Sequence, residues 1–410
     1  MGRTTSDETL RPVFVLKTHA IGLGVSRSLA VKGVPVIGID YAKDAKDLRS
    51  NSFVAHHMIP DIEKSPGVAV EALTRCQEGL GKRAILFPCS DSFILFISRN
   101  RKRLAEHFDF QLPSEAVMEL IMNKKSQYMR AVELGIPIPE TYYPTCLDDL
   151  DAFKDDIHYP VLIKPCYSHL WQERFPNKGF QAFNAEELVR YYQKTIDADI
   201  EVIVQEVIIG PNTNLRGMRA YIDEEGGVHG VLESNKVRQY PVDFGIGCLN
   251  QTSHNEVVAR QGLQLMRGIG YRGIGAVEFK LDERDGVFKL MELNARVGKT
   301  IALSTKVGVN LPWMMYQDMV GMPIDGDVEY ADGVRWHDFI QDCRAYHTLR
   351  ARKEITFKDW VRTSLRSECH PFFAWDDLRP ALVHTRYGLD TMLEIYYTLV
   401  FSAGRFIRHQ

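Results

Sequence analysis

The sequence lacks the features that direct a chain to a membrane, a nucleic acid or an oxidising compartment. No run of about 18 apolar residues occurs, and the first residues form no apolar core of a signal peptide. The net charge of −3 gives no basic excess for nucleic acid. The seven cysteines show no C-x-x-C spacing, so neither a disulfide framework nor a zinc site is predicted. We expect a cytoplasmic protein with no transmembrane segment and no nucleic-acid partner.

What is present is an ordinary globular composition. The chain has 410 residues, of which 45% are hydrophobic and 25% charged. That length predicts two to four packed units. No internal repeat or low-complexity tract is visible, and the sequence leaves a homo-oligomer open.

The first part of the chain alternates predicted strands and helices. Strands are expected at 13–16, 34–40 and 84–87, and a helix opens at Gly22 and Gly24 and closes at Gly33. This order is typical of a doubly wound, Rossmann-like α/β domain, which we assign to residues 1–112.

The remainder is predicted to be α+β and then helical. A small subdomain (113–198) should hold helices near 115–122 and 123–134, a strand at 161–165 and a long loop from 166 to 183. A larger subdomain (199–330) should hold a strand at 202–207, a helix near 256–269 and two strands, 275–281 and 288–294, joined by a turn. Residues 331–410 should form a mainly helical extension. Its apolar stretch 393–401 is either a packed helix or an interfacial anchor.

Two acidic residues lie on neighbouring predicted strands. Side chains alternate along a strand, so Glu292, Asn294 and Arg296 share one face. Glu278 joins that face if the two strands pair in an even register. Two carboxylates and an amide oxygen are hard ligands that suit Mg²⁺. The alternative is a solvated strand face with surface ion pairs.

Lysines occupy two positions that suit phosphate. Lys164 ends an apolar strand just before a proline, so its backbone is fixed. Lys124 and Lys125 open a helix whose N-terminus favours anions. An ammonium group binds phosphate as a point charge, although plain solvent exposure is the alternative for any single lysine.

Another strand ends in a turn that suits a nucleotide base. In Gln205-Glu206-Val207, backbone groups are candidates for an adenine edge and the carboxylate for a ribose hydroxyl. Asn212 stands where an acidic ribose contact is expected. A strand that merely ends in a turn is the alternative.

In chain order, these motifs resemble the nucleotide site of the ATP-grasp superfamily. Segments 235–247 and 373–380 are similar to a branch of predicted ATP-dependent carboligases, close to D-aspartate ligases and carbamoyl-phosphate-synthase-like proteins. The resemblance covers nearly the whole chain. It differs at residues 166–179, where many relatives carry a glycine- and serine-rich flap over the triphosphate.

The resemblance implies an ATP-grasp fold with ATP and Mg²⁺, or Mn²⁺, as cofactors. ATP would be held by Lys124 or Lys125, Lys164, Gln205, Glu206, Val207 and Asn212. The metal would be held by Glu278, Glu292 and Asn294. Arg296, Arg238 and Lys236 would act on the acyl phosphate, the tetrahedral intermediate or a phosphate.

Substrate contacts are expected in the first domain. His19, Asp91 and Ser92 follow parallel strands at the edge where open α/β sheets bind ligands. Asp91 is a candidate for holding an ammonium group, and turn capping is the alternative.

The expected activity is a ligase that joins a small-molecule carboxylate to an amine through an acyl phosphate, with release of ADP and phosphate. An amino acid or a small derivative is the expected substrate. A bicarbonate-activating carboxylase or carbamoyl-phosphate-like enzyme is one alternative, and a non-catalytic ATP-binding protein is the other.

Overall fold

A computed structural model of the chain describes residues 10–41, 50–326 and 328–386. The chain divides into two compact units. An N-terminal unit comprises Met1–Phe110, Lys299–Ala302 and Trp336–Gln410, and a central unit comprises Gln111–Gly298 and Leu303–Arg335. The C-terminal segment thus clusters with the first domain. The apolar stretch 393–401 lies outside the described residues.

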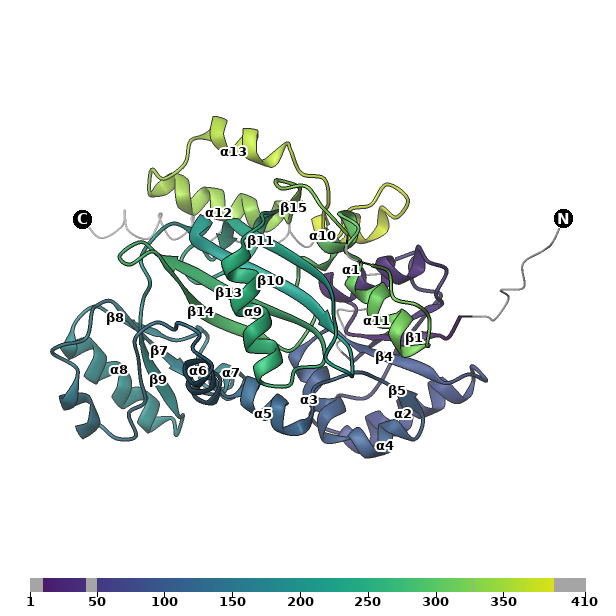
Figure 1. The fold of residues 1–410 in the computed structure, drawn as a ribbon, viewed down its shortest axis with the longest axis horizontal. Coiled ribbons are helices and arrows are strands. Elements are labelled where there is room, and N and C mark those ends of the chain that lie inside the picture. The colour runs from purple at the N-terminus through teal and green to yellow at the C-terminus, as the bar shows by residue number, and fades with distance from the viewer. Residues whose placement is uncertain (1–9, 42–49, 327, 387–410) are drawn as a thin grey trace, which may run out of the picture. The chain divides into compact units, whose positions relative to one another are not determined.

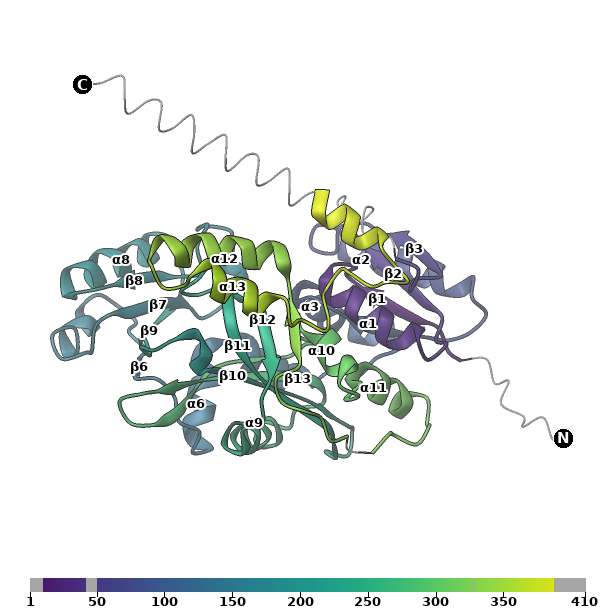
Figure 2. The same cartoon turned by 90° about the horizontal axis from the view of Figure 1, so that it is seen from above.

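A parallel sheet forms the core of the N-terminal unit. Its strands lie in the order β3-β2-β1-β4-β5, and Val13–Leu16 is fully buried because both faces are covered. Figure 2 shows helix α1 alongside β1 and β2. The elements are β1 (Val13–Leu16), α1 (Ala20–Ala30), β2 (Val36–Asp40), β3 (Ala55–Met58), α2 (Pro66–Glu78), β4 (Ala84–Pro88), α3 (Asp91–Arg99), α4 (Arg101–Ala105) and β5 (Phe108–Asp109). The predicted doubly wound α/β fold is confirmed.

The C-terminal part of this unit is helical where it is described. It contains α12 (Phe339–Ala351) and α13 (Phe357–Ser364), which pack against each other. Asp377 lies further on and accepts a hydrogen bond from Arg27 of α1 at 2.9 Å. This contact ties the C-terminal segment to the first helix of the chain.

The small subdomain is built on a four-stranded sheet of order β6-β9-β7-β8. Helix α8 covers this sheet (Figure 1). The elements are α5 (Glu115–Met122), α6 (Lys124–Glu133), β6 (Thr141–Tyr142), the 3₁₀ helix η2 (Asp148–Ala152), β7 (Val161–Pro165), α7 (Ser168–Gln172), β8 (Phe180–Ala182), α8 (Ala185–Asp197) and β9 (Val202–Glu206). The two predicted helices are present. The prediction of a long loop over 166–183 is wrong in part, because α7 and β8 form within it.

The large subdomain is an antiparallel sheet of order β14-β13-β10-β11-β12, followed by β15. Figure 1 shows helix α9 lying across it. The elements are the 3₁₀ helix η3 (Asn212–Asn214), β10 (Leu215–Ile222), β11 (Val228–Tyr240), β12 (Ile246–Thr252), α9 (Glu256–Gly268), β13 (Gly273–Asp282), β14 (Val287–Asn294), α10 (Ile301–Lys306), α11 (Leu311–Met319) and β15 (Arg335–His337). The predicted helix at 256–269 and the two strands that follow it are confirmed.

The two faces of this sheet have opposite chemistry. Met218, Val277 and Leu293 are direct partners on three neighbouring strands and are buried. Helix α9 packs on this face, and an added Cβ at Gly262 would lie 2.6 Å from Met218. The residues that alternate with these three along each strand therefore lie on the opposite face of the sheet. Because side chains alternate, a slip of one residue would bury the polar face under α9, so the apolar face fixes the register.

Candidate functional site

The polar face of the large sheet brings the two predicted acidic ligands together. Glu278 of β13 is the direct cross-strand partner of Glu292 of β14, and Ala276 is the partner of Asn294. The even register that the sequence required is therefore present. Like charges directly opposite each other on a sheet destabilise it unless a cation lies between or beside them.

Each carboxylate has a lysine partner. Lys124 Nζ lies 3.1 Å from Glu292 Oε1, and Lys236 Nζ lies 2.8 Å from Glu278 Oε2. Burial acts to raise the pKa of Glu292, but Lys124, Arg296 and Lys164 outweigh it and hold the pKa at about 2. The carboxylate therefore stays ionised and able to bind a cation at any physiological pH.

Helix α6 is docked so that its first residue reaches this face. The Gln127 side chain donates to Leu293 O at 3.1 Å and accepts from Leu293 N–H at 3.1 Å. Tyr128 OH donates to Met291 O at 2.6 Å. These bonds satisfy the outer edge of β14, which is an edge strand. Lys124 is thereby held beside Glu292.

Lys124 and Lys125 take different directions. Lys125 Nζ lies 3.5 Å from Glu201 Oε1, whereas Lys124 reaches Glu292. The sequence left the choice between them open. The structure places Lys124 at the paired carboxylates and Lys125 at an exposed ion pair.

Lys164 is held by a hydrogen-bonded amide rather than by an acid. Its Nζ donates to Gln205 Oε1 at 2.7 Å, and Gln205 Nε2 donates to Thr141 Oγ1 at 2.8 Å. Burial, followed by repulsion from Lys124, lowers the pKa of Lys164 to about 8. This ammonium lacks a direct carboxylate partner in the structure described, so a phosphate would relieve its unfavourable environment.

Glu206, which was expected at the nucleotide, is part of an ion-pair network. Its carboxylate binds Arg284 Nη2 at 2.6 Å and Lys289 Nζ at 3.3 Å, and it accepts the backbone N–H of Glu140 at 2.9 Å. The side chain is 5% exposed. The role of this segment at the adenine and the ribose stays a prediction.

The same network contains a buried aspartate, and it supports a stability prediction. Asp282 is 1% exposed and binds Arg284 and Lys289. We expect Asp282→Asn to lower the free energy of unfolding by about 2 kcal/mol, because Arg284 and Lys289 then lose the more deeply buried of the two acids that they share. Chemical denaturation at pH 7 measures this loss.

Lowering the pH should reduce the difference in the free energy of unfolding between wild type and Asp282→Asn. Hydrogen bonds from Arg284 hold the pKa of Asp282 well below its usual range. The contribution of Asp282 to stability is therefore present above the unfolded-state pKa of about 4 and is lost as the pH falls through the folded-state pKa.

Asp285→Asn changes the 46% exposed member of the same network and should lower the free energy of unfolding by less than about 1 kcal/mol. Equal losses in the two variants would contradict the prediction.

Val207 and Asn212 were also expected at the nucleotide, and both make hydrogen bonds to neighbouring segments. Val207 N–H donates to Pro160 O at 3.0 Å, and Lys280 Nζ donates to Ile208 O at 2.7 Å. Asn212 accepts from Gln239 Nε2 at 3.0 Å and donates to Val242 O at 3.3 Å. Asn212 thus fixes the loop that follows β11.

Two of the three expected catalytic residues, Lys236 and Arg296, lie close to the acidic pair. Lys236 binds Glu278 directly, and Arg296 is close enough to Glu292 to help lower the pKa of that carboxylate. Arg238 is buried on β11, two residues beyond Lys236. The arrangement supplies positive charge around a point where negative charge would develop.

His19, Asp91 and Ser92 lie in the N-terminal unit at the carboxyl ends of neighbouring strands. His19 precedes α1 and Asp91 begins α3, while β1 and β4 pair in parallel with Leu16 opposite Pro88. Ser92 Oγ lies 3.1 Å from Ser90 Oγ. The structure thus brings the three to one edge of the parallel sheet, as expected.

Asp40 also lies at this edge, and it was not among the expected substrate contacts although the sequence places it at the end of a strand. It is 2% exposed, binds Lys17 Nζ at 3.2 Å and accepts from the Thr18 backbone at 2.9 Å. Its position at the end of β2 was the available signal. The ion pair holds the loop after β1 in place.

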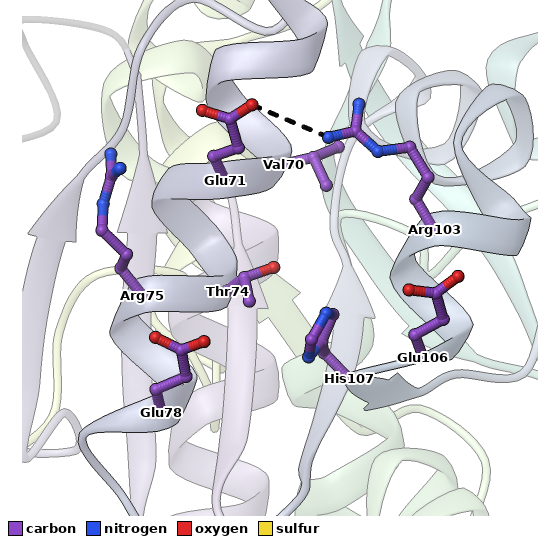
Figure 3. A pocket seen from close by; sticks show the side chains of 8 residues that line it. All are labelled: Val70, Glu71, Thr74, Arg75, Glu78, Arg103, Glu106 and His107. Atoms are coloured by element: carbon purple, nitrogen blue, oxygen red, sulfur yellow. Dashed lines mark ion pairs between the residues drawn. The ribbon is translucent and has the colours of Figure 1, made fainter.

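A surface groove of about 310 Å³ lies elsewhere in this unit, between α2 and the end of α4 (Figure 3). Glu71 and Arg103 face each other across it at 3.8 Å. Its lining carries three carboxylates and two guanidinium groups. The groove therefore offers no surplus positive charge for a polyanion such as ATP, and it contains none of the expected site residues.

The residues at the acidic pair fit a magnesium nucleotide. Two carboxylates lie directly opposite each other and an amide follows on the same strand as Glu292, which is a hard-oxygen donor set. Within the described parts of the chain, no group of three or more His, Cys, Asp and Glu side chains could hold a metal by itself. A Mg²⁺ ion that shares its ligands between two carboxylates and phosphates suits this site.

Sequence reasoning missed two cations near this site. Arg219 of β10 is opposite Ala276, so it shares the face of Glu278, and its guanidinium donates to Ser234 Oγ at 3.0 Å. Lys178 follows α7 and is within electrostatic reach of Glu278 and Glu292. Strand alternation would have found Arg219 once the register was known, whereas no local pattern points to Lys178.

The fold matches that of ATP-grasp carboxylases and ligases. Over residues 248–325 the chain matches the family described as "Carbamoyl-phosphate synthase L chain, ATP binding domain". Both findings agree with the resemblance to the ATP-grasp superfamily that the sequence motifs indicated. No helix in the described residues is long and apolar enough to cross a membrane.

Individual proteins show the same relationship. D-aspartate ligase of Enterococcus faecium is 27% identical over 297 residues, which cover 68% of this chain and 70% of that protein. The large chain of carbamoyl phosphate synthase from Methanobrevibacter smithii is 22% identical over 47% of this chain, but this match spans only 18% of that protein. The biotin carboxylase of Campylobacter jejuni, solved with a β,γ-ATP ligand, has a TM-score of 0.62 at 16% identity and covers 77% of this chain and 72% of that one.

Proposed function

We propose that the chain is an ADP-forming ligase that joins a carboxylate to an amine. The pair Glu278–Glu292, each with its own lysine and with Lys164 nearby, is the observation on which this proposal depends. It is a site for Mg²⁺ and the phosphates of ATP. The relationship to D-aspartate ligase supports an amino acid or a small derivative as one substrate.

The reaction has two balanced steps. An oxygen of the substrate carboxylate attacks the γ-phosphorus, the bond from that phosphorus to the β,γ-bridging oxygen breaks, and ADP leaves with the electron pair. The amine nitrogen then attacks the acyl carbon, the carbon–oxygen bond to phosphate breaks, and phosphate leaves while the nitrogen loses a proton to solvent. The products are an amide, ADP and phosphate.

The proposed roles follow the placement of the residues. Glu278, Glu292 and Asn294 would hold Mg²⁺, which would neutralise charge on the phosphates. Lys124 and Lys164 bind phosphate oxygens. Gln205 fixes Lys164 in position.

Cationic side chains other than the phosphate-binding lysines are proposed to act on the acyl phosphate. Arg296 stabilises the oxyanion that forms when the amine attacks, and Lys236 and Arg238 neutralise the departing phosphate. In the N-terminal unit, His19 and Ser92 are proposed to contact a substrate, and Asp91 to hold its ammonium group.

The test is a matrix of ADP and phosphate release with Mg²⁺-ATP. Amino acids, amines and small carboxylates are combined pairwise, with and without bicarbonate, and amide products are identified by mass spectrometry. We expect release that requires one acid and one amine. Release that requires bicarbonate would replace the proposal with a carboxylase or a carbamoyl-phosphate-like enzyme. ATP binding without release in any combination would favour a non-catalytic binder.

A further inference from the structure

The segment after β7 is anchored by a buried tryptophan. Trp171 of α7 is 1% exposed, and its Nε1 donates to Asn177 O at 2.9 Å and to Asn177 Oδ1 at 3.0 Å. Its ring lies 4.6 Å from that of Phe175 and 5.0 Å from that of Phe180. Trp171 belongs to the core of the small subdomain. The segment is therefore fixed to that core, unlike a flexible glycine-rich flap.

The chain then returns to β7 at Gly179. An added Cβ there would lie 2.6 Å from Ile163 O, so only glycine allows this close approach. Ile163 pairs with Phe180 of β8 and precedes Lys164. Asn177 on one side and Gly179 on the other thus fix the backbone of Lys178 beside the strand that carries Lys164.

Lys178 extends from this segment towards the large subdomain. Its Nζ lies 3.5 Å from Phe244 O, in the loop that follows β11. Burial, together with the positive charges of Lys236 and Lys124, lowers the pKa of Lys178, while Glu292 and Glu278 act to raise it. The ammonium is therefore within electrostatic reach of both expected metal ligands and both of their lysine partners. Neighbouring groups partly desolvate the ammonium, but the residue as a whole is exposed to solvent, which leaves it accessible to a ligand.

We propose that Lys178 binds the γ-phosphate of ATP from the small-subdomain side. A glycine-rich flap holds phosphate with backbone N–H groups. Here an anchored aromatic segment supplies a side-chain ammonium instead, and a single point charge suits a terminal phosphate. The inference rests on the proposed nucleotide site.

The two expected metal ligands indicate which phosphate Lys178 binds, and it is the γ-phosphate. Mg²⁺ bridges the β- and γ-phosphates in phosphoryl-transfer sites, so its ligands mark that end of the nucleotide. Glu278 and Glu292 both interact electrostatically with Lys178. Lys280, by contrast, already donates a hydrogen bond to Ile208 O, in the segment expected at the adenine. Lys178 should therefore distinguish ATP from ADP.

The experiment is calorimetry of Lys178→Met with Mg²⁺ and either ADP or a non-hydrolysable ATP analogue. We expect the dissociation constant of the analogue to rise at least about tenfold, which corresponds to loss of one charge-assisted hydrogen bond. The constant for ADP should stay at the wild-type value. Lys178→Arg should keep most of the preference for the analogue, because it keeps the charge.

Arg174→Met is the matched control, since Arg174 is an exposed cation in the same segment. This control should bind both nucleotides like wild type. A Lys178→Met variant that matches the control, or one that loses ADP and the analogue equally, overturns the inference and leaves the proposed ligase intact. A wild-type protein that binds neither nucleotide overturns both. An unchanged ADP constant also shows that the variant is folded.

Discussion

Glu292→Ala should lower ADP formation by about a thousandfold, the largest effect we expect from one substitution. The carboxylate is the direct partner of Glu278, and its low pKa keeps it charged. Removing it takes away a proposed metal ligand and the carboxylate that binds Lys124. A metal ion contributes several kcal/mol to transition-state charge stabilisation, and each 1.4 kcal/mol is a factor of ten in rate.

The measurement is ADP release with the substrates found in the matrix, over a range of Mg²⁺ concentrations. Glu283→Ala is the control, because Glu283 lies in the turn of the same hairpin and binds Asn214 at 2.9 Å. The control should keep its activity. Near-wild-type ADP release from Glu292→Ala at low Mg²⁺ would remove the proposed metal site.

Lys164→Met should have the second-largest effect, a loss of about tenfold to a hundredfold in affinity for Mg²⁺-ATP. Phosphate favours the charged form of the lysine, so binding raises its pKa above the value of about 8 in the free protein. Affinity should therefore be highest below pH 8 and decline as the pH rises through 8 and the free lysine loses its proton. The variant should lose this decline along with the affinity.

Calorimetry in buffers of different ionisation enthalpy measures the proton taken up on binding at pH 8. Uptake should be present in wild type and reduced in Lys164→Met. Lys125→Met is the control, because that lysine pairs with Glu201. Unchanged proton uptake in Lys164→Met would show that another group titrates. An equal loss of affinity in Lys125→Met would contradict the assignment of Lys164.

The sheet face that carries the acidic pair was predictable because strand periodicity is local. Glu292 and Asn294 alternate with apolar neighbours, and so does Glu278. Only the register was unreadable, and the structure supplies it through the apolar partners Met218, Val277 and Leu293.

The segment over 166–183 was the least predictable part of the site. The sequence suggested an irregular loop, but Trp171 is buried and orders the segment through Asn177. A tryptophan in a polar stretch carries no local signal of this kind. The distant residues that bury it decide its role, and with it the position of Lys178.

The sequence by itself determined most of the strands and helices, the strand ends that carry His19 and Asp91, and the shared strand face of Glu292 and Asn294. These follow from hydrophobic periodicity and turn residues within short windows. Only the tertiary structure decided that Lys124 rather than Lys125 meets Glu292, 168 residues away, and that Glu206 pairs with Arg284. Long side chains choose partners by reach and charge across segments, and nothing in the local sequence encodes that choice.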